Sequence, residues 1–197
     1  MRLDPLDPPS PEAADLAAAI VASRARALPG VQVADPDGRL QGPFACLPYT
    51  PPLSRAVQQV GSELRRSTRL SSAVTEAVIL SVATHWRADY EWYAHARSAV
   101  EDGSLDPEDL NRIAAGERGL ADPAADVASA LTRELLATTA VSDGLWSEAR
   151  TALGDRRAVE VVLLAGYYSS LAMLIRTFHT PLPAGAQVPP EWNDRTA

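Results

Sequence analysis

The chain has 197 residues, of which 46% are hydrophobic, and a formal net charge of −7. This length and composition suit one folded domain with a hydrophobic core and exclude a disordered protein. The acidic charge argues against nucleic acid or an anionic membrane as the main partner. Because Cys46 is the single cysteine, an internal disulfide, a CxxC redox pair and a thiolate zinc cage are also excluded.

The sequence predicts a soluble, cytoplasmic protein. The first twenty residues, MRLDPLDPPSPEAADLAAAI, lack the basic region and long apolar run of a secretory signal. The longest apolar run, VVLLAGYY at 161–168, is much shorter than the roughly 20 residues that a membrane-spanning helix needs. We therefore expect no membrane partner.

Apolar residues recur at helical spacing through most of the chain, and strand-like alternation is found nowhere, so the predicted fold class is all-α. Proline and glycine interrupt the pattern most strongly between 29 and 51, where we expect a long loop with turns and no strand. The expected helices are 11–28, one from Pro51 onward, 71–86, 90–102, short helices from 107 and from 123, one from Ser142 to Gly154, and a last long helix from Asp155 to Phe178.

Capping residues set the expected starts of several helices. Ser10, Asp106 and Asp122 each precede a proline, an arrangement in which the side chain caps the helix and proline takes its first position. Asp89 can cap another helix, which Gly103 would close.

The segment WRADYEWYAHARSAV at 86–100 concentrates polar and aromatic side chains. Glu91 and His95 are four residues apart and therefore share one face of a helix, where they can touch. A carboxylate that hydrogen-bonds one imidazole nitrogen fixes the tautomer and leaves the other nitrogen for acid–base chemistry. If the helices on either side of the RAD break form an antiparallel hairpin, Glu76 approaches this pair. Burial by aromatic neighbours would then raise the pKa of at least one carboxyl group, which suits proton transfer.

The same residues also allow structural interpretations. A Glu–His pair at this spacing is commonly solvated or structural, and residues such as Trp92 and Tyr93 commonly fill a core or an interface. Two glutamates and a histidine could bind a metal, but the HExxH spacing is absent, and we predict neither a metal nor a cofactor. Cys46, in PFACLPY, has no local signature of a nucleophilic cysteine.

Two hexapeptides suggest an internal repeat. TEAVIL and VEVVLL align Glu76 with Glu160, and nineteen residues after each glutamate stands a histidine, His95 or His179. The pattern fits a two-fold helical repeat and fits coincidence equally well.

The order and spacing of these segments resemble the carboxymuconolactone decarboxylase family, which includes the alkylhydroperoxidase-D-like proteins. The resemblance covers residues 43–183, from LPYTPPLSRAVQQVGSELRRSTRLSSAVTEAVIL through ILSVATHWRADYEWYAHARSAV to VSDGLWSEARTALGDRRAVEVVLLAGYYSSLAMLIRTFHTPLP. It implies an all-α, alkylhydroperoxidase-D-like multi-helix bundle that assembles as a homo-oligomer, a trimer or hexamer. Residues 1–42 are then an N-terminal helix and loop extension, and residues 184–197 a loose C-terminal tail.

In the peroxidase branch of this family, a glutamate is followed twelve residues on by a CxxC pair, and a histidine stands four residues after the second cysteine. On this chain the glutamate and histidine correspond to Glu76 and His95, and the cysteine positions to Ala88 and Glu91. Thiol peroxidase chemistry needs an attacking and a resolving thiol. The resemblance therefore argues against that activity here.

The decarboxylase branch has an acidic residue and a histidine in this helix, no obligatory cysteine pair and no cofactor. The resemblance therefore implies a lyase or isomerase that acts on a small carboxylated or lactone-type compound. His95 or Glu91 would supply the proton, and Glu76 would orient one of them.

The residues that bind the substrate are expected in the same segment. An arginine, Arg87 or Arg97, would hold the substrate carboxylate. The aromatic residues expected to line the site are Trp86, Tyr90 and Trp92. The alternative is a non-catalytic oligomer of the same fold that binds a small molecule or a partner.

Overall fold

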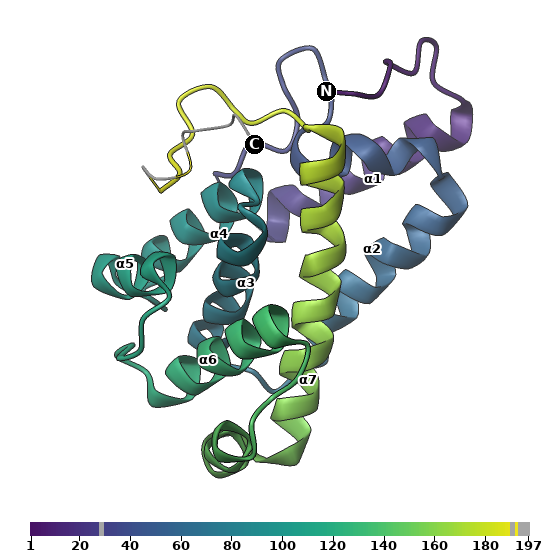
Figure 1. Ribbon diagram of the computed structural model, residues 1–197. Helices are drawn as coiled ribbons and strands as arrows, with labels where there is room; N and C mark the ends of the chain where they lie inside the picture. The colour runs from purple at the N-terminus through teal and green to yellow at the C-terminus, as the bar shows by residue number, and fades with distance from the viewer. Residues whose placement is uncertain (28–29, 190–191, 193–197) are drawn as a thin grey trace.

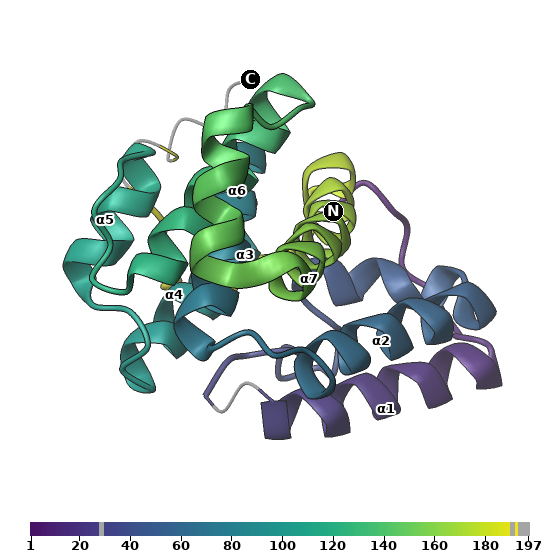
Figure 2. The ribbon, with the colours of Figure 1, turned by 90° about the horizontal axis from the view of Figure 1, so that it is seen from below.

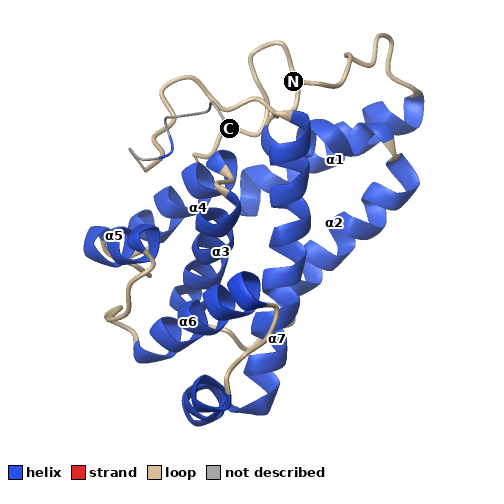
Figure 3. Ribbon diagram, viewed as in Figure 1, coloured by secondary structure: helices blue, strands red, loops and turns tan. Residues whose placement is uncertain are grey.

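In the computed structural model, residues 1–27, 30–189 and 192 are described, and in these ranges helices form the regular structure apart from one isolated β-bridge, between Ala34 and Leu40 (Figure 3). The predicted all-α class is confirmed. The helices, in chain order, are α1 (Pro11–Ala27), the 3-10 helix η1 (Gly42–Tyr49), α2 (Pro51–Arg66), α3 (Ser72–Trp86), α4 (Asp89–Glu101), α5 (Pro107–Ala115), α6 (Pro123–Thr138) and α7 (Asp143–Phe178).

The centre of the bundle is α3, against which α4, α6 and α7 pack (Figures 1 and 2). Its apolar residues are buried on most sides of the helix, as expected of a helix that has other helices around it. Ser81 is also fully buried there, where its hydroxyl donates to the Ala77 carbonyl and lies 2.8 Å from the Ser129 hydroxyl of α6. Small side chains therefore allow α6 to approach α3 closely.

Most helix starts follow the predicted caps. The side chains of Ser10, Asp106 and Asp122 each accept a hydrogen bond from a backbone amide in the first turn of α1, α5 and α6. At α4 the prediction is one residue out, because Asp89 is the first helical residue and Ala88 takes the cap position.

The predicted loop at 29–51 contains a helix that was not expected. The turn at DPDG is present, with the Gly38 amide donating to the Asp35 carbonyl, but residues 42–49 form η1. Phe44 and Leu47 are buried in the main core, so this proline-rich segment is ordered by tertiary packing rather than by helix propensity. Leu28 and Pro29, at the predicted end of the first helix, lie outside the described residues.

Two predicted C-terminal helices are one element, α7, with a break at Gly154, whose φ of 73° and ψ of 165° are not helical. Among the described residues α7 alone is long and apolar enough to cross a membrane, by length and composition only. However, 56% of its most apolar window is buried inside the protein, which fits a core helix. The described part of the predicted loose tail packs against α4, where the rings of Trp92 and Trp192 are 5.3 Å apart.

The apolar residues of α2 are divided between the core and the surface, because Val57 and Leu64 are half-buried against the core. The periodic residues Leu53 and Val60 are 65% and 51% exposed, whereas Ser54 and Gly61 are buried. The neighbouring helix α7 also exposes large apolar side chains on its surface. These are Val159, Val162, Leu163 and Met173.

The sequence echo between Glu76 and Glu160 does not produce a second Glu–His pair. Glu160 instead accepts hydrogen bonds from the Arg156 side chain and the Arg69 amide. His179 is exposed at the end of α7, where its φ is 50°.

Candidate functional site

A tight reversal between α3 and α4 brings Glu76 and His95 together. Arg87, with a φ of 51°, ends α3, and α4 begins two residues later. The two helices then run back along each other, and His95 Nδ1 lies 2.8 Å from Glu76 Oε2. Because a carboxylate only accepts, Nδ1 carries the proton that is donated. Glu76 therefore fixes the orientation of the imidazole and leaves Nε2 as its second functional atom.

Glu91 lies on the same helix as His95 but does not pair with it. The side chain is 2% exposed, and neither carboxyl oxygen has a hydrogen-bond partner among the described residues. The predicted Glu91–His95 contact is replaced by the Glu76–His95 hydrogen bond. Burial without compensating partners raises the pKa of Glu91 well above its usual range. This carboxyl group is thereby favoured in its protonated form.

Glu91 and His95 share a small cavity of about 20 Å³. A cavity of this size holds about one water molecule. Its walls come from α1, η1, α4 and α7, and its lining residues are Arg24, Pro43, Phe44, Tyr90, Glu91, Ala94, His95, Tyr167, Tyr168 and Leu171.

Aromatic side chains form much of the cavity wall. The ring of Tyr168 stands edge-on to the His95 imidazole, with 5.1 Å between ring centres. Burial raises the pKa of the Tyr168 and Tyr90 hydroxyls, so both stay neutral. The Tyr90 hydroxyl donates to the Gln32 carbonyl, 2.8 Å away. The site is thus a largely apolar enclosure around a few polar groups.

Arg24, which the sequence analysis did not single out, is a buried cation in the cavity wall. It is 3% exposed, donates from Nη2 to Gln58 Oε1 at 2.9 Å, and lies over the Phe44 ring at 5.0 Å. A sequence signal existed. The buried face of α1 runs through Leu16 and Ile20, and Arg24 is four residues further along that face.

Of the four residues predicted to bind substrate, only Tyr90 lines this cavity. Arg87 is exposed at the end of α3, and Trp86 is half-buried beside His85. Trp92 points into a different depression. For these three residues the helical register, not proximity in sequence, sets the direction of the side chain.

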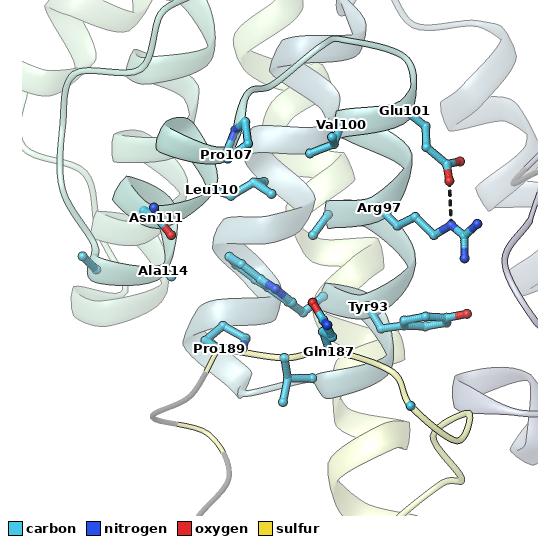
Figure 4. Close-up of a pocket in the computed structure, with 15 residues that line it drawn as sticks. Tyr93, Arg97, Val100, Glu101, Pro107, Leu110, Asn111, Ala114, Gln187 and Pro189 are labelled. Carbon is cyan, nitrogen blue, oxygen red and sulfur yellow. Dashed lines mark hydrogen bonds and ion pairs between the residues drawn. The ribbon is translucent and has the colours of Figure 1, made fainter.

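A second and larger cleft, of about 850 Å³, lies between α4, α5 and residues 185–189 (Figure 4). Val100 and Leu110 supply apolar walls, and Arg97 there pairs with Glu101 at 2.7 Å. Arg97 is therefore an exposed cation with an acidic partner rather than a residue of the Glu91–His95 cavity.

The two positions that the resemblance aligns with cysteines carry no thiol. Ala88 and Glu91, which the sequence resemblance aligns with the two thiols of the peroxidase branch, are both buried in or next to α4. The single thiol, Cys46, lies in η1, where burial raises its pKa to about 11. Among the described residues, no three His, Cys, Asp or Glu side chains form a group that could hold a metal ion.

The described residues form an all-helical bundle in which the α3–α4 hairpin carries the Glu76–His95 hydrogen bond. Neither a family model nor a curated protein matches the chain. Among solved structures, the chain is similar to the crystal structure of an uncharacterized peroxidase-related protein from Silicibacter sp. TM1040. The two share a TM-score of 0.63 and 14% identity, over 81% of this chain and 93% of that chain. At this identity the likeness shows a common fold, and it does not single out the decarboxylase branch.

Gly61 is required where α2 crosses Tyr167. A Cβ atom at this position would overlap the Tyr167 hydroxyl and lie 2.6 Å from its Cζ. We expect Gly61→Ala to lower the free energy of unfolding by about 1–3 kcal/mol, as for other overpacked sites. Gly144→Ala is the matched control, because nothing lies within 4 Å of a Cβ there. It should stabilise α7 by up to about 1 kcal/mol. Urea denaturation measures both, and equal effects of the two substitutions would contradict the proposed clash.

The raised pKa of Glu91 gives a defined pH dependence. The folded protein binds this proton more tightly than the unfolded chain. The contribution of Glu91 to stability is therefore greatest at low pH and falls as pH rises from the unfolded pKa towards the folded one. Glu91→Gln removes this dependence, so the variant should gain stability relative to wild type as pH rises above about 5. Denaturation at several pH values tests this, with exposed Glu117→Gln as control. A parallel pH profile for wild type and Glu91→Gln would show that folding leaves the pKa of Glu91 unchanged, which contradicts the prediction.

Proposed function

We propose that the protein is a cofactor-free lyase or isomerase that uses Glu/His proton transfer on a small carboxylated or lactone-type compound. The observation that carries this proposal is the buried, unpartnered Glu91 carboxyl group, which shares one cavity with an imidazole oriented by Glu76. Unpartnered buried carboxyl groups cost stability, and they are typical of sites where an acid must hold its proton at neutral pH.

Each residue has a separate role in the proposed reaction. When a carboxylated substrate breaks its C–C bond to release CO₂, the bonding electron pair stays on the remaining carbon as an enolate-type anion. Protonated Glu91 donates its proton to that carbon and becomes a carboxylate. His95 then returns a proton from solvent to Glu91, while Glu76 holds the imidazole at Nδ1. Exclusion of water by the aromatic walls strengthens these electrostatic interactions.

The small size of the cavity favours the second candidate, a non-catalytic oligomer of the same fold that binds a small molecule or a partner. In the described conformation the space of about 20 Å³ holds a water molecule and excludes a substrate. Catalysis therefore requires a wall to move, and η1, which carries Pro43 and Phe44, is the shortest element of that wall. A non-catalytic protein would not need to open and close the cavity in a repeated reaction cycle.

Turnover by matched histidine variants separates the two candidates. Wild-type protein is incubated with a panel of small carboxylated lactones and unsaturated carboxylic acids, and CO₂ release and substrate absorbance are followed. We expect His95→Gln to lose about 100-fold or more in rate, the usual contribution of a general acid or base. His179→Gln, which changes an exposed histidine, should leave the rate unchanged. Full activity in His95→Gln would overturn the assigned role, and an inactive wild type would favour the non-catalytic candidate.

We also propose that the protein is a homo-oligomer that assembles through the exposed apolar faces of α2 and α7. Two adjacent helices that present Leu53, Val60 and Leu163 to solvent form the kind of surface that subunit contacts cover. Gly166, on the exposed surface of α7, allows another helix to approach closely.

Light scattering after size-exclusion chromatography tests the assembly. The wild type should have the mass of a trimer or hexamer, and Leu163→Glu should shift it to the monomer, because a charge buried in an interface is costly. Val100→Glu, which alters an exposed apolar residue at the α4–α5 cleft, is the control and should keep the wild-type mass. A monomeric wild type would refute the proposed interface.

A further inference from the structure

Arg24 is a buried positive charge without an acidic partner. None of the ion pairs formed by the described residues includes it, although it is 3% exposed. Within the described residues it donates a hydrogen bond to the neutral Gln58 amide, its guanidinium lies over the Phe44 ring, and it interacts with the neutral Tyr167 hydroxyl. Arginine stays protonated in proteins, so the charge is permanent.

Arg24 lines the cavity and has one N–H group without a hydrogen-bond partner among the described residues. Arg24 Nε is buried and has no hydrogen-bond partner among the described residues, and the same holds for the Tyr167 hydroxyl. Both residues line the Glu91–His95 cavity. Arg24 and Tyr167 are close enough to interact electrostatically. Burial raises the pKa of Tyr167, and the positive charge of Arg24 opposes that rise. Arg24 and Tyr167 are therefore neighbours in the cavity wall, and Arg24 Nε is left without a hydrogen-bond partner among the described residues.

The cavity has two chemically different ends. Arg24 and Tyr167 supply donors from α1 and α7, and Glu91 and His95 supply acid–base groups from α4. Glu91 forms no ion pair with Arg24 among the described residues, and neither of its oxygens has a hydrogen-bond partner there. A buried cation left in this state is costly unless an anion completes it. A ligand anion is the group that the wall lacks.

We propose that Arg24 is the anion-binding residue of this cavity and that the ligand is a small carboxylate. This inference rests on the proposed function for the location of the site, and it names the substrate group that the site holds. The planar fork of a guanidinium matches a carboxylate, and a neighbouring phenol can donate a further hydrogen bond to it. A carboxylate held at the Arg24 end places the rest of a short carbon chain towards Glu91 and His95.

The geometry also restricts the size of the ligand. The space of about 20 Å³ already holds no more than a water molecule, so even a short carboxylate must displace the side chains of η1 at the wall. Pro43 and Phe44 are those side chains, and the Phe44 ring is the face on which the Arg24 guanidinium rests. Movement of Phe44 would therefore expose Arg24 as it opens the cavity.

Acetate and acetamide are the probes for this proposal, because they have the same shape and differ in charge. Binding is measured by isothermal titration calorimetry and by the thermal midpoint, at constant ionic strength set with sodium chloride. We expect acetate, and not acetamide, to bind and to raise the midpoint of the wild type. Arg24→Met should weaken acetate binding about tenfold or more, and Arg24→Lys should weaken it less because the charge remains. Arg55→Gln, an exposed arginine on α2, is the control and should bind acetate as the wild type does.

The stability of Arg24→Met without acetate separates binding from a structural role. Replacing an unpaired buried cation with an apolar side chain of similar volume should leave the midpoint unchanged or raise it. A lowered midpoint together with wild-type acetate binding would overturn the proposal, and so would a wild type that fails to distinguish acetate from acetamide. If Arg24→Met does not fold, the Arg24→Lys affinity and the wild-type comparison decide the question.

Failure of this proposal is distinguishable from failure of the proposed function. His95→Gln should keep acetate binding while losing turnover, because it leaves Arg24 unchanged. Wild-type turnover in His95→Gln with acetate binding still dependent on Arg24 would refute proton transfer and leave the anion site intact. Loss of turnover in His95→Gln together with full acetate binding by Arg24→Met would do the reverse.

Discussion

The hydrogen bond between Glu76 and His95 is the interaction on which the arrangement of the site depends. It joins the central helix α3 to α4 across a short reversal and fixes which face of α4 turns inward. With His95 held in this way, Glu91 one turn earlier is carried into the interior. The burial of Glu91 is therefore a consequence of helical geometry and of the Glu76–His95 contact, in which Glu91 takes no part.

Within the described part of the chain, three of the buried polar residues that keep an unpartnered atom line one cavity between α1, α4 and α7. A stable core would replace Arg24, Glu91 and Tyr167 by apolar residues or would pair them with one another. Instead, each keeps a buried polar atom without a protein partner in the described ranges. Polar groups left in this way commonly mark positions where a bound molecule completes the contacts.

Much of the fold could be predicted from local sequence, and the site could be predicted in part. Caps such as Asp106 and Asp122 act within one turn, so the helix starts follow from nearby residues. The meeting of Glu76 and His95 followed from the hairpin. Arg24 was missed because its significance depends on contacts far along the chain. The predicted Glu91–His95 contact was wrong. Helical spacing permits this pair, but Glu76 on the neighbouring helix α3 binds His95 instead.

The origin of Arg24 in α1 has a consequence for how proteins of this architecture diversify. The acid–base groups belong to the inner hairpin of α3 and α4, and the cation arrives on a separate helix near the chain terminus. Substitutions in α1 would alter which molecules the cavity admits, whereas the reactive groups on α3 and α4 would stay in place. The residue that selects the ligand and the residues that transfer protons would thus change independently. New specificities could arise through α1 while α3 and α4 stayed the same.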